Sequence, residues 1–129
     1  MNGYLLDTNA ALIALTDPGR LPQAMQTAIL AGPNVISVVS YWEVLLKSMK
    51  GTLDVGDPRR WWHDTIDQLA ATVLSLKPDH VGMVQELLPL HKDPFDRVLI
   101  AQAVVEGLEM VTLDSDIRRY ASPVFRVIS

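Results

Sequence analysis

Acidic residues dominate the chemistry that this sequence offers. Of the 129 residues, fifteen are acidic, and eleven of these are aspartates. Aspartate disfavours helix interiors and is common at helix caps, in turns and at metal sites. The formal net charge is −4, so any nucleic acid must be held by a local basic patch. The absence of cysteine excludes disulfide scaffolds, cysteine zinc sites and thiol nucleophiles.

Four acids stand at predicted strand ends or in the first turns of predicted helices. They are Asp7, Glu43, Asp96 and Asp114. Asp96 shares a helical stripe with the apolar residues Leu99 and Ile100. A carboxylate that heads such a stripe faces inward, where a charge is costly unless it is paired or bound to a metal.

Helix capping is the alternative explanation for several of these acids. Asp7 can cap the helix that follows it, and Ser40 with Glu43 forms a capping-box pattern. Capping explains Asp93, which precedes Pro94, completely. Of Asp114 and Asp116, one can cap a short helix, which leaves the other for a ligand.

Short apolar runs alternate with helical patterns along the chain. Strands are predicted at 4–6, 35–38, 72–74, 110–113 and 125–128. Helices are predicted at about 10–15, 22–31, 40–50, 58–70, 78–88 and 94–106, with a short one after Asp114. This alternation predicts βαβ units and a single α/β domain over residues 1–129, with a mostly parallel sheet covered on both faces.

The stretch 21–42 lacks charged residues but is not interpreted as a membrane span. Gly32, Pro33 and Asn34 interrupt it with a turn signal, which favours a helix, a turn and a buried strand. The N-terminus has no basic region and carries Asp7 within its apolar run, so we expect no signal peptide. A cytoplasmic protein without a membrane segment is therefore expected.

The carboxyl ends of parallel strands share one edge of a sheet, where ligands bind. We therefore expect the four acids to meet in one crevice, together with a compensating cation. Oxygen ligands of this kind suit Mg²⁺ or Mn²⁺ rather than zinc. His63, His80 and His91 lack zinc-ligand spacing and are interpreted as surface or core residues. The chemistry predicted is metal-assisted hydrolysis of a phosphodiester, without a covalent nucleophile.

With these residues identified, the chain resembles the PIN-domain nucleases over essentially its full length. More narrowly, it resembles the VapC-type toxins of bacterial toxin–antitoxin pairs. Four segments in order carry the resemblance: 5–9 (LLDTN), 40–44 (SYWEV), 91–103 (HKDPFDRVLIAQA) and 111–114 (VTLD). The third segment is the most specific of the four.

The resemblance implies a three-layer α/β/α fold with about five strands and an acidic site. In that site Asp7, Glu43, Asp96 and Asp114 would be the catalytic, metal-binding quartet. Thr8, Asn9 and Thr112 would be supporting polar residues, and Asp116 would assist or replace Asp114.

The activity implied is that of an endoribonuclease that depends on Mg²⁺, with Mn²⁺ as an alternative, and leaves a 5′-phosphate. Such a toxin would inhibit translation or growth, would be blocked by a cognate antitoxin protein and would form a homodimer. For phosphate contacts to RNA, the candidate cations are Lys47 and Lys50, on the helix of Glu43, and Arg97, beside Asp96.

Two other function classes share part of this acidic pattern. Asp114 and Asp116 imitate the Asp-x-Asp pair of a strand-end phosphatase, but little chain remains after them to complete such a site. A non-catalytic receiver-like signalling module would share the acidic pocket, but it needs a lysine at a late strand end, and the last lysine is Lys92.

The adjacent Trp61 and Trp62 are both predicted to pack in the core, with a partner or dimer contact for one of them as the alternative.

Overall fold

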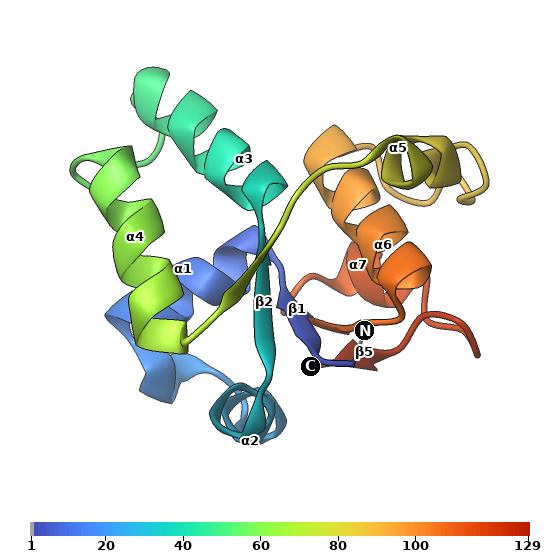
Figure 1. Ribbon diagram of the computed structural model, residues 1–129, viewed down its shortest axis with the longest axis horizontal. Coiled ribbons are helices and arrows are strands. Elements are labelled where there is room, and N and C mark those ends of the chain that lie inside the picture. Colours follow the sequence, from blue (N-terminus) through green and yellow to red (C-terminus); the bar gives the residue numbers. More distant parts are fainter. Residues whose placement is uncertain (1) are drawn as a thin grey trace.

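A computed structural model describes residues 2–129 and shows helices packed on both sides of a central sheet (Figure 1). The strands are β1 (Tyr4–Leu6), β2 (Asn34–Ser37), β3 (Thr72–Leu74), β4 (Glu109–Val111) and β5 (Val127–Ile128). The helices are α1 (Thr8–Thr16), the short 3₁₀ helix η1 (Pro18–Arg20), α2 (Gln23–Ala31), α3 (Val38–Met49), α4 (Pro58–Leu69), α5 (Pro78–Val84), α6 (Pro94–Glu106) and α7 (Ser115–Arg118).

The five strands form one sheet in the order β3-β2-β1-β4-β5, and every neighbouring pair is parallel. Leu5 of β1 is in register with Val35 of β2 on one side and with Met110 of β4 on the other. The predicted parallel sheet is thereby confirmed. Because all strands run the same way, their carboxyl ends lie at one edge of the sheet, and the helices that follow start there.

Two apolar cores, one on each face of the sheet, give the three-layer arrangement. Consecutive strand residues point to opposite faces, so Leu5 packs in the core below α6 whereas Leu6 packs in the core with α1, α2 and α4. Trp61 and Trp62 are both buried in this second core, which confirms the prediction that both pack internally.

Three predicted helix boundaries are wrong by two residues or more. Helix α1 starts at Thr8 rather than at about residue 10, directly after its cap Asp7. Helix α3 starts at Val38 rather than at residue 40, because the Ser37 side chain accepts the backbone N–H of Val39 at 3.0 Å. Ser40 is thus inside the helix and the predicted capping box does not form. Helix α5 ends at Val84 rather than at residue 88, where the Arg97 guanidinium donates to the last carbonyl group of the helix and to those of Leu87 and Leu88 after it.

Within residues 2–129, each helix is too short or too polar to cross a membrane.

Candidate functional site

The N-terminal ends of α1, α3, α6 and α7 bring acidic side chains to the carboxyl edge of the sheet, between the helix layers on its two faces (Figure 1). Asp7 follows β1 directly and is only 3% exposed. Its Oδ1 accepts the backbone N–H of Ala10 at 2.8 Å, so it caps α1. The capping explanation is therefore correct for one oxygen, and the other oxygen remains for the site.

Thr112 joins the ends of β1 and β4. Its fully buried hydroxyl donates a short hydrogen bond to Oδ2 of Asp7. The same hydroxyl accepts the backbone N–H of Asp114 at 2.9 Å. The resemblance placed Thr112 beside the acids, and the structure places it there as well.

Glu43 enters the site from the second turn of α3 and is 4% exposed. Its Oε1 accepts from the Thr8 hydroxyl at 2.6 Å, and that hydroxyl also contacts Ser40 Oγ at 3.0 Å. Its Oε2 accepts from Lys47 Nζ at 2.7 Å. Hydrogen bonds from both sides therefore hold the Glu43 carboxylate in place.

Asp96 and Asp114 meet at His91, which lies between α5 and α6. His91 Nε2 is 2.8 Å from Asp96 Oδ2 and 3.5 Å from Asp114 Oδ2. One polar atom from each of these three residues lies within 4.8 Å of the other two, so the two carboxylates and the ring converge on one small volume. Asp114 also caps α7 through Oδ1, which accepts the backbone N–H of Asp116 at 2.7 Å.

Burial and mutual repulsion raise the pKa values of two of the acids. Burial is the main cause for Asp7, whose pKa rises to about 6, with smaller contributions from the charges of Asp114 and Glu43. Burial also leads for Asp96, whose pKa rises to about 7, followed by the charges of Asp93 and Glu43. Asp7 contributes to this shift as well, so the four acids share one electrostatic site.

This donor set fits a divalent cation. Among residues 2–129, Lys47 is the only lysine or arginine that pairs with any of the four acids, and it pairs with Glu43 alone. Carboxylates held this close are destabilised when ionised unless a positive charge joins them. Oxygen donors of this kind suit Mg²⁺ or Mn²⁺.

Three residues that were predicted near the site contribute less than expected. Asn9 is exposed in the first turn of α1. Asp116 is exposed and pairs with Arg119 at 3.8 Å, so Asp114 and not Asp116 lies in the site. The Arg97 guanidinium is occupied by carbonyl groups, including Leu88 O at 3.0 Å, so we assign it a structural role rather than an RNA contact.

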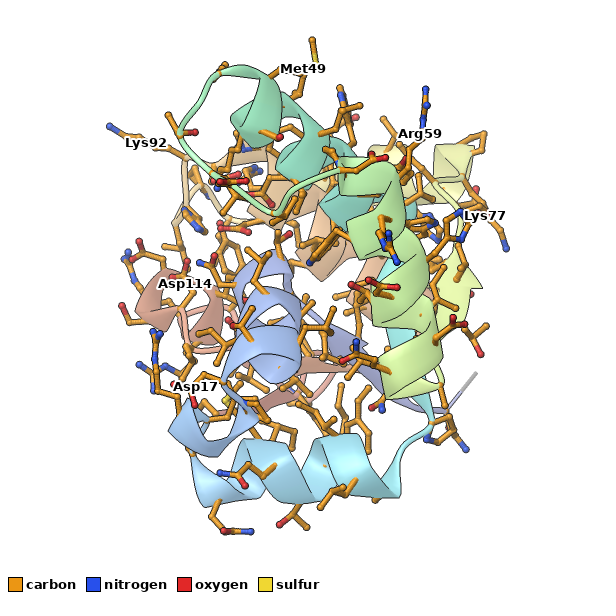
Figure 2. The ribbon with its side chains drawn as sticks, turned by 90° about the vertical axis from the view of Figure 1, so that its left-hand side faces the viewer. Asp17, Met49, Arg59, Lys77, Lys92 and Asp114 are labelled. Atoms are coloured by element: carbon orange, nitrogen blue, oxygen red, sulfur yellow. The ribbon has the colours of Figure 1, made fainter. Side chains whose placement is uncertain are left out.

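Lysines are available nearby. Lys50 is exposed after the end of α3, and Lys47 is partly exposed beside Glu43. Lys92 and Asp114 lie on the same side of the molecule (Figure 2). Lys47 therefore lies directly beside one of the acids although the net charge of the chain is −4.

His91 is the site residue that sequence reasoning missed, since it was interpreted as a surface or core residue. A signal was present, because His91 lies five residues before Asp96 in the most specific of the four segments. The interpretation of His80 as a core residue agrees with its complete burial.

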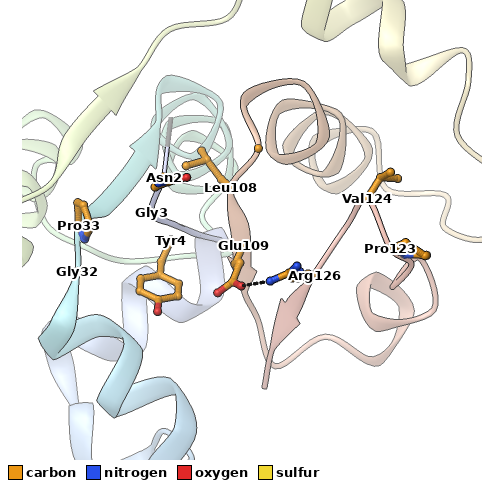
Figure 3. A pocket seen from close by; sticks show the side chains of 11 residues that line it. Asn2, Gly3, Tyr4, Gly32, Pro33, Leu108, Glu109, Pro123, Val124 and Arg126 are labelled. Carbon is orange, nitrogen blue, oxygen red and sulfur yellow. Dashed lines mark ion pairs between the residues drawn. The ribbon is translucent and has the colours of Figure 1, made fainter.

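A cavity of about 490 Å³ lies elsewhere, at the amino ends of β1 and β4 (Figure 3). Its lining includes Tyr4, Leu108 and an ion pair between Glu109 and Arg126, whose atoms are 3.5 Å apart. None of the four acids contributes to it. The acidic site is instead at the carboxyl ends of the strands, where ligands of open parallel sheets bind.

The sequence matches a known protein family over most of its length. The PIN domain family matches residues 4–123. The chain belongs to the PIN domain family. PIN domains are typically nucleases and generally use divalent metals, which supports a nuclease role for this PIN domain and agrees with its acidic donor set.

Solved structures with the same fold include several toxin–antitoxin complexes. DNA-bound VapBC from Salmonella typhimurium matches with a TM-score of 0.70 at 17% identity, over 98% of this chain and 97% of the other. VapBC-1 from nontypeable Haemophilus influenzae matches with a TM-score of 0.70 at 14% identity, over 98% and 96%. A toxin–antitoxin complex from Klebsiella pneumoniae matches with a TM-score of 0.61 at 23% identity, over 98% and 96%. No curated protein matches the sequence.

Proposed function

We propose that this PIN domain is an endoribonuclease that depends on Mg²⁺ or Mn²⁺, and that it is the toxin of a toxin–antitoxin pair. The observation that carries the nuclease proposal is the meeting of Asp7, Glu43, Asp96 and Asp114 at one edge of the sheet with a shortage of positive partners. Family membership supports it. Membership of the PIN family also argues against a receiver-like module. The phosphatase alternative requires Asp114 and Asp116 to act as a pair, and Asp116 instead faces outward and contacts Arg119.

In this proposal Asp7, Asp96 and Asp114 hold the cation, and Glu43 completes the acidic set. When bound, a divalent ion polarises a phosphate oxygen and makes a water molecule a better nucleophile. The chain supplies the orientation, because Thr112 holds Asp7, Thr8 holds Glu43, and main-chain N–H groups hold Asp114.

Phosphate binding is assigned to Lys47, on the same helix as Glu43, and to Lys50, directly after that helix ends. Lys47 stays close to the site through its ion pair with Glu43, and Lys50 is exposed a turn further on. An ammonium group near the acids offsets their repulsion of the RNA backbone. The acids therefore bind the metal while neighbouring lysines bind the polymer.

A cognate antitoxin and a homodimer are proposed as partners. The titles of the fold neighbours describe VapBC and toxin–antitoxin complexes, and this supports an antitoxin partner here. Three exposed apolar side chains share one face of α3 and support an additional protein contact: Trp42, Leu45 and Met49, called here the α3 stripe. As a toxin, this PIN domain would cleave RNA that translation requires and would thereby stop growth. We place this activity in the cytoplasm.

Cleavage of RNA by the purified chain tests the nuclease proposal. We expect cleavage of single-stranded RNA with Mg²⁺ or Mn²⁺, and no cleavage in excess EDTA. Asp7→Asn should lower the cleavage rate by at least about 100-fold, as does removal of a group that stabilises transition-state charge. The matched control is Asp17→Asn, which changes an exposed aspartate at the far end of α1.

Unimpaired cleavage by Asp7→Asn, or cleavage in EDTA, would disprove the metal site. Cleavage of the corresponding single-stranded DNA at the same rate would disprove the assignment to RNA.

A further inference from the structure

His91 lies outside any helix or strand, yet its main chain is held firmly. Its backbone N–H donates to the Tyr120 hydroxyl at 3.0 Å. Its carbonyl accepts from the Arg97 guanidinium at 3.4 Å. The side chain is 13% exposed. A loop residue fixed in this way presents its ring in one orientation.

Tyr120 and Arg97 together clamp the segment that leads to His91. The Tyr120 hydroxyl donates to Leu88 O at 2.6 Å and accepts the N–H of Leu90 at 3.0 Å. Arg97 donates to Leu88 O at 3.0 Å and to the Tyr120 hydroxyl at 3.1 Å. Tyr120 follows α7, which Asp114 caps, and Arg97 belongs to α6, which carries Asp96. The clamp therefore ties His91 to the elements that position both of these acids.

The hydrogen bonds of the ring indicate which nitrogen carries the proton. Nδ1 accepts the backbone N–H of Asp93 at 3.4 Å. With Nδ1 as the acceptor, the proton is on Nε2, which then donates to Asp96 Oδ2 at 2.8 Å. A nitrogen that carries a proton has no lone pair for a metal. The ring thus acts on the carboxylates and not on the cation itself.

We propose that His91 is a positioning residue that orients the carboxylate of Asp96, next to Asp114, toward the divalent cation from outside its ligand shell. This inference rests on the proposed metal site and adds a fifth residue to it. Donors that hold metal ligands typically contribute 10–100-fold to metal affinity, according to measurements on other proteins. Its removal should therefore weaken metal binding as well as cleavage.

Binding of Mn²⁺ to the metal-free chain, measured by isothermal titration calorimetry, tests the proposal without relying on cleavage. His91→Ala should weaken Mn²⁺ binding by about 10-fold or more. Tyr120→Phe, which removes the hydroxyl of the clamp, should weaken it in the same direction. His63→Ala is the matched control, because His63 is exposed on α4, and it should bind Mn²⁺ like the wild type.

Two further substitutions separate orientation from a general structural effect. The amide nitrogen of glutamine reaches the place of Nε2, so His91→Gln should keep Mn²⁺ affinity within about 3-fold of the wild type. The amide nitrogen of asparagine reaches only the place of Nδ1, so His91→Asn should behave like His91→Ala. Thermal unfolding without metal checks that the variants are folded.

Wild-type affinity in His91→Ala, together with lost Mn²⁺ binding in Asp7→Asn, would overturn this inference and leave the proposed function intact. Hyperfine coupling of bound Mn²⁺ to an imidazole nitrogen that disappears in His91→Gln would also overturn it, because His91 would then be a direct ligand. A wild-type chain that binds no Mn²⁺ would overturn both proposals together.

Discussion

At the scale of single residues, two aspartate side chains each make two different contacts through their two oxygens. Asp7 uses Oδ1 to cap α1 and Oδ2 to accept from Thr112, and Asp114 uses Oδ1 to cap α7 while Oδ2 faces His91. Capping and metal binding are therefore not competing explanations for these aspartates. Both follow from a carboxylate at the point where a strand ends and a helix begins.

The raised pKa values of Asp7 and Asp96 predict how the stability of the metal-free protein depends on pH. Each carboxyl has an ordinary value of 3.8, which rises to about 6 for Asp7 and about 7 for Asp96 in the folded chain. The stability that each contributes is complete below its unfolded pKa and is lost as the pH rises through the folded value. We expect the metal-free wild type to lose more free energy of unfolding than Asp96→Asn between about pH 5 and about pH 8.

Urea unfolding of both proteins at the two pH values measures this difference. Saturating Mg²⁺ should stabilise the wild type more at the higher pH, where the acids are ionised. Asp116→Asn, which removes an exposed acid nearby, serves as the control and should follow the wild type. Parallel profiles for the wild type and Asp96→Asn would contradict the prediction.

At the scale of elements, a chain of buried polar contacts joins α5, α6 and the start of α3. Gln102 of α6 accepts from the Ser37 hydroxyl at 2.6 Å, and its amide nitrogen is 3.2 Å from Nδ1 of His80. Nε2 of His80 is in turn 2.9 Å from Glu106 Oε2. Ser37 caps the helix of Glu43, and Gln102 lies on the helix of Asp96. These contacts therefore fix the position of α3 relative to α6.

Gln102→Met tests this coupling between helices. The substitution nearly conserves volume but removes the acceptor of the buried Ser37 hydroxyl proton and the amide contact with His80, so we expect the free energy of unfolding to fall by about 1–3 kcal/mol. The control Gln68→Met makes the same change at an exposed position of α4 and should stay within about 0.5 kcal/mol of the wild type. Urea unfolding measures both, and equal stability of the two variants would show that the contacts are dispensable.

At the scale of the whole molecule, the two helix layers leave apolar surface uncovered. The side chains of the α3 stripe are 38–75% exposed, with Leu45 at the lower value and Met49 at the upper. Apolar surface that recurs along one helix face favours a protein contact. Helix α3 also carries Glu43, so an assembly formed there would lie close to the acidic site.

Leu45→Lys is expected to convert a wild-type homodimer into a monomer, because it places a charge within the α3 stripe. Leu30→Lys is the matched control, since Leu30 is exposed on α2 and away from the stripe. Sedimentation velocity at equal protein concentration measures the mass of each. A dimer that persists in Leu45→Lys would place the interface elsewhere.

RNA binding should depend on salt despite the net charge of −4. In the non-cleaving Asp7→Asn background, Lys50→Ala should weaken binding and reduce the slope of log affinity against log salt by about 0.7, the value for one phosphate contact of a single strand. Arg20→Ala removes one charge in η1, the short helix that Asp17 precedes, and should leave the slope unchanged. Asp17 and Met49 lie far apart in Figure 2. An unchanged slope in Lys50→Ala would exclude that contact.

Local patterns determined much of what was predictable about this protein. The run Tyr4–Leu6 followed by Asp7, and Asp93 and Pro94 at the start of α6, predict elements whose residues interact mainly with near neighbours. Alternation of such elements implies a parallel sheet, and a parallel sheet places the four acids at one edge. Fold class and acidic edge therefore follow from periodicity and capping, which act over a few residues.

Tertiary structure alone decided which polar groups from distant segments meet. Arg97 resembled a surface cation in sequence but donates to carbonyls up to thirteen residues away, and Tyr120 reaches His91 across 29 positions. Such contacts arise because buried polar groups must find partners wherever the folded chain supplies them, and no local period records that pairing. For that reason His91 became part of the acidic site only when the packing of α6 and α7 brought Asp96 and Asp114 to it.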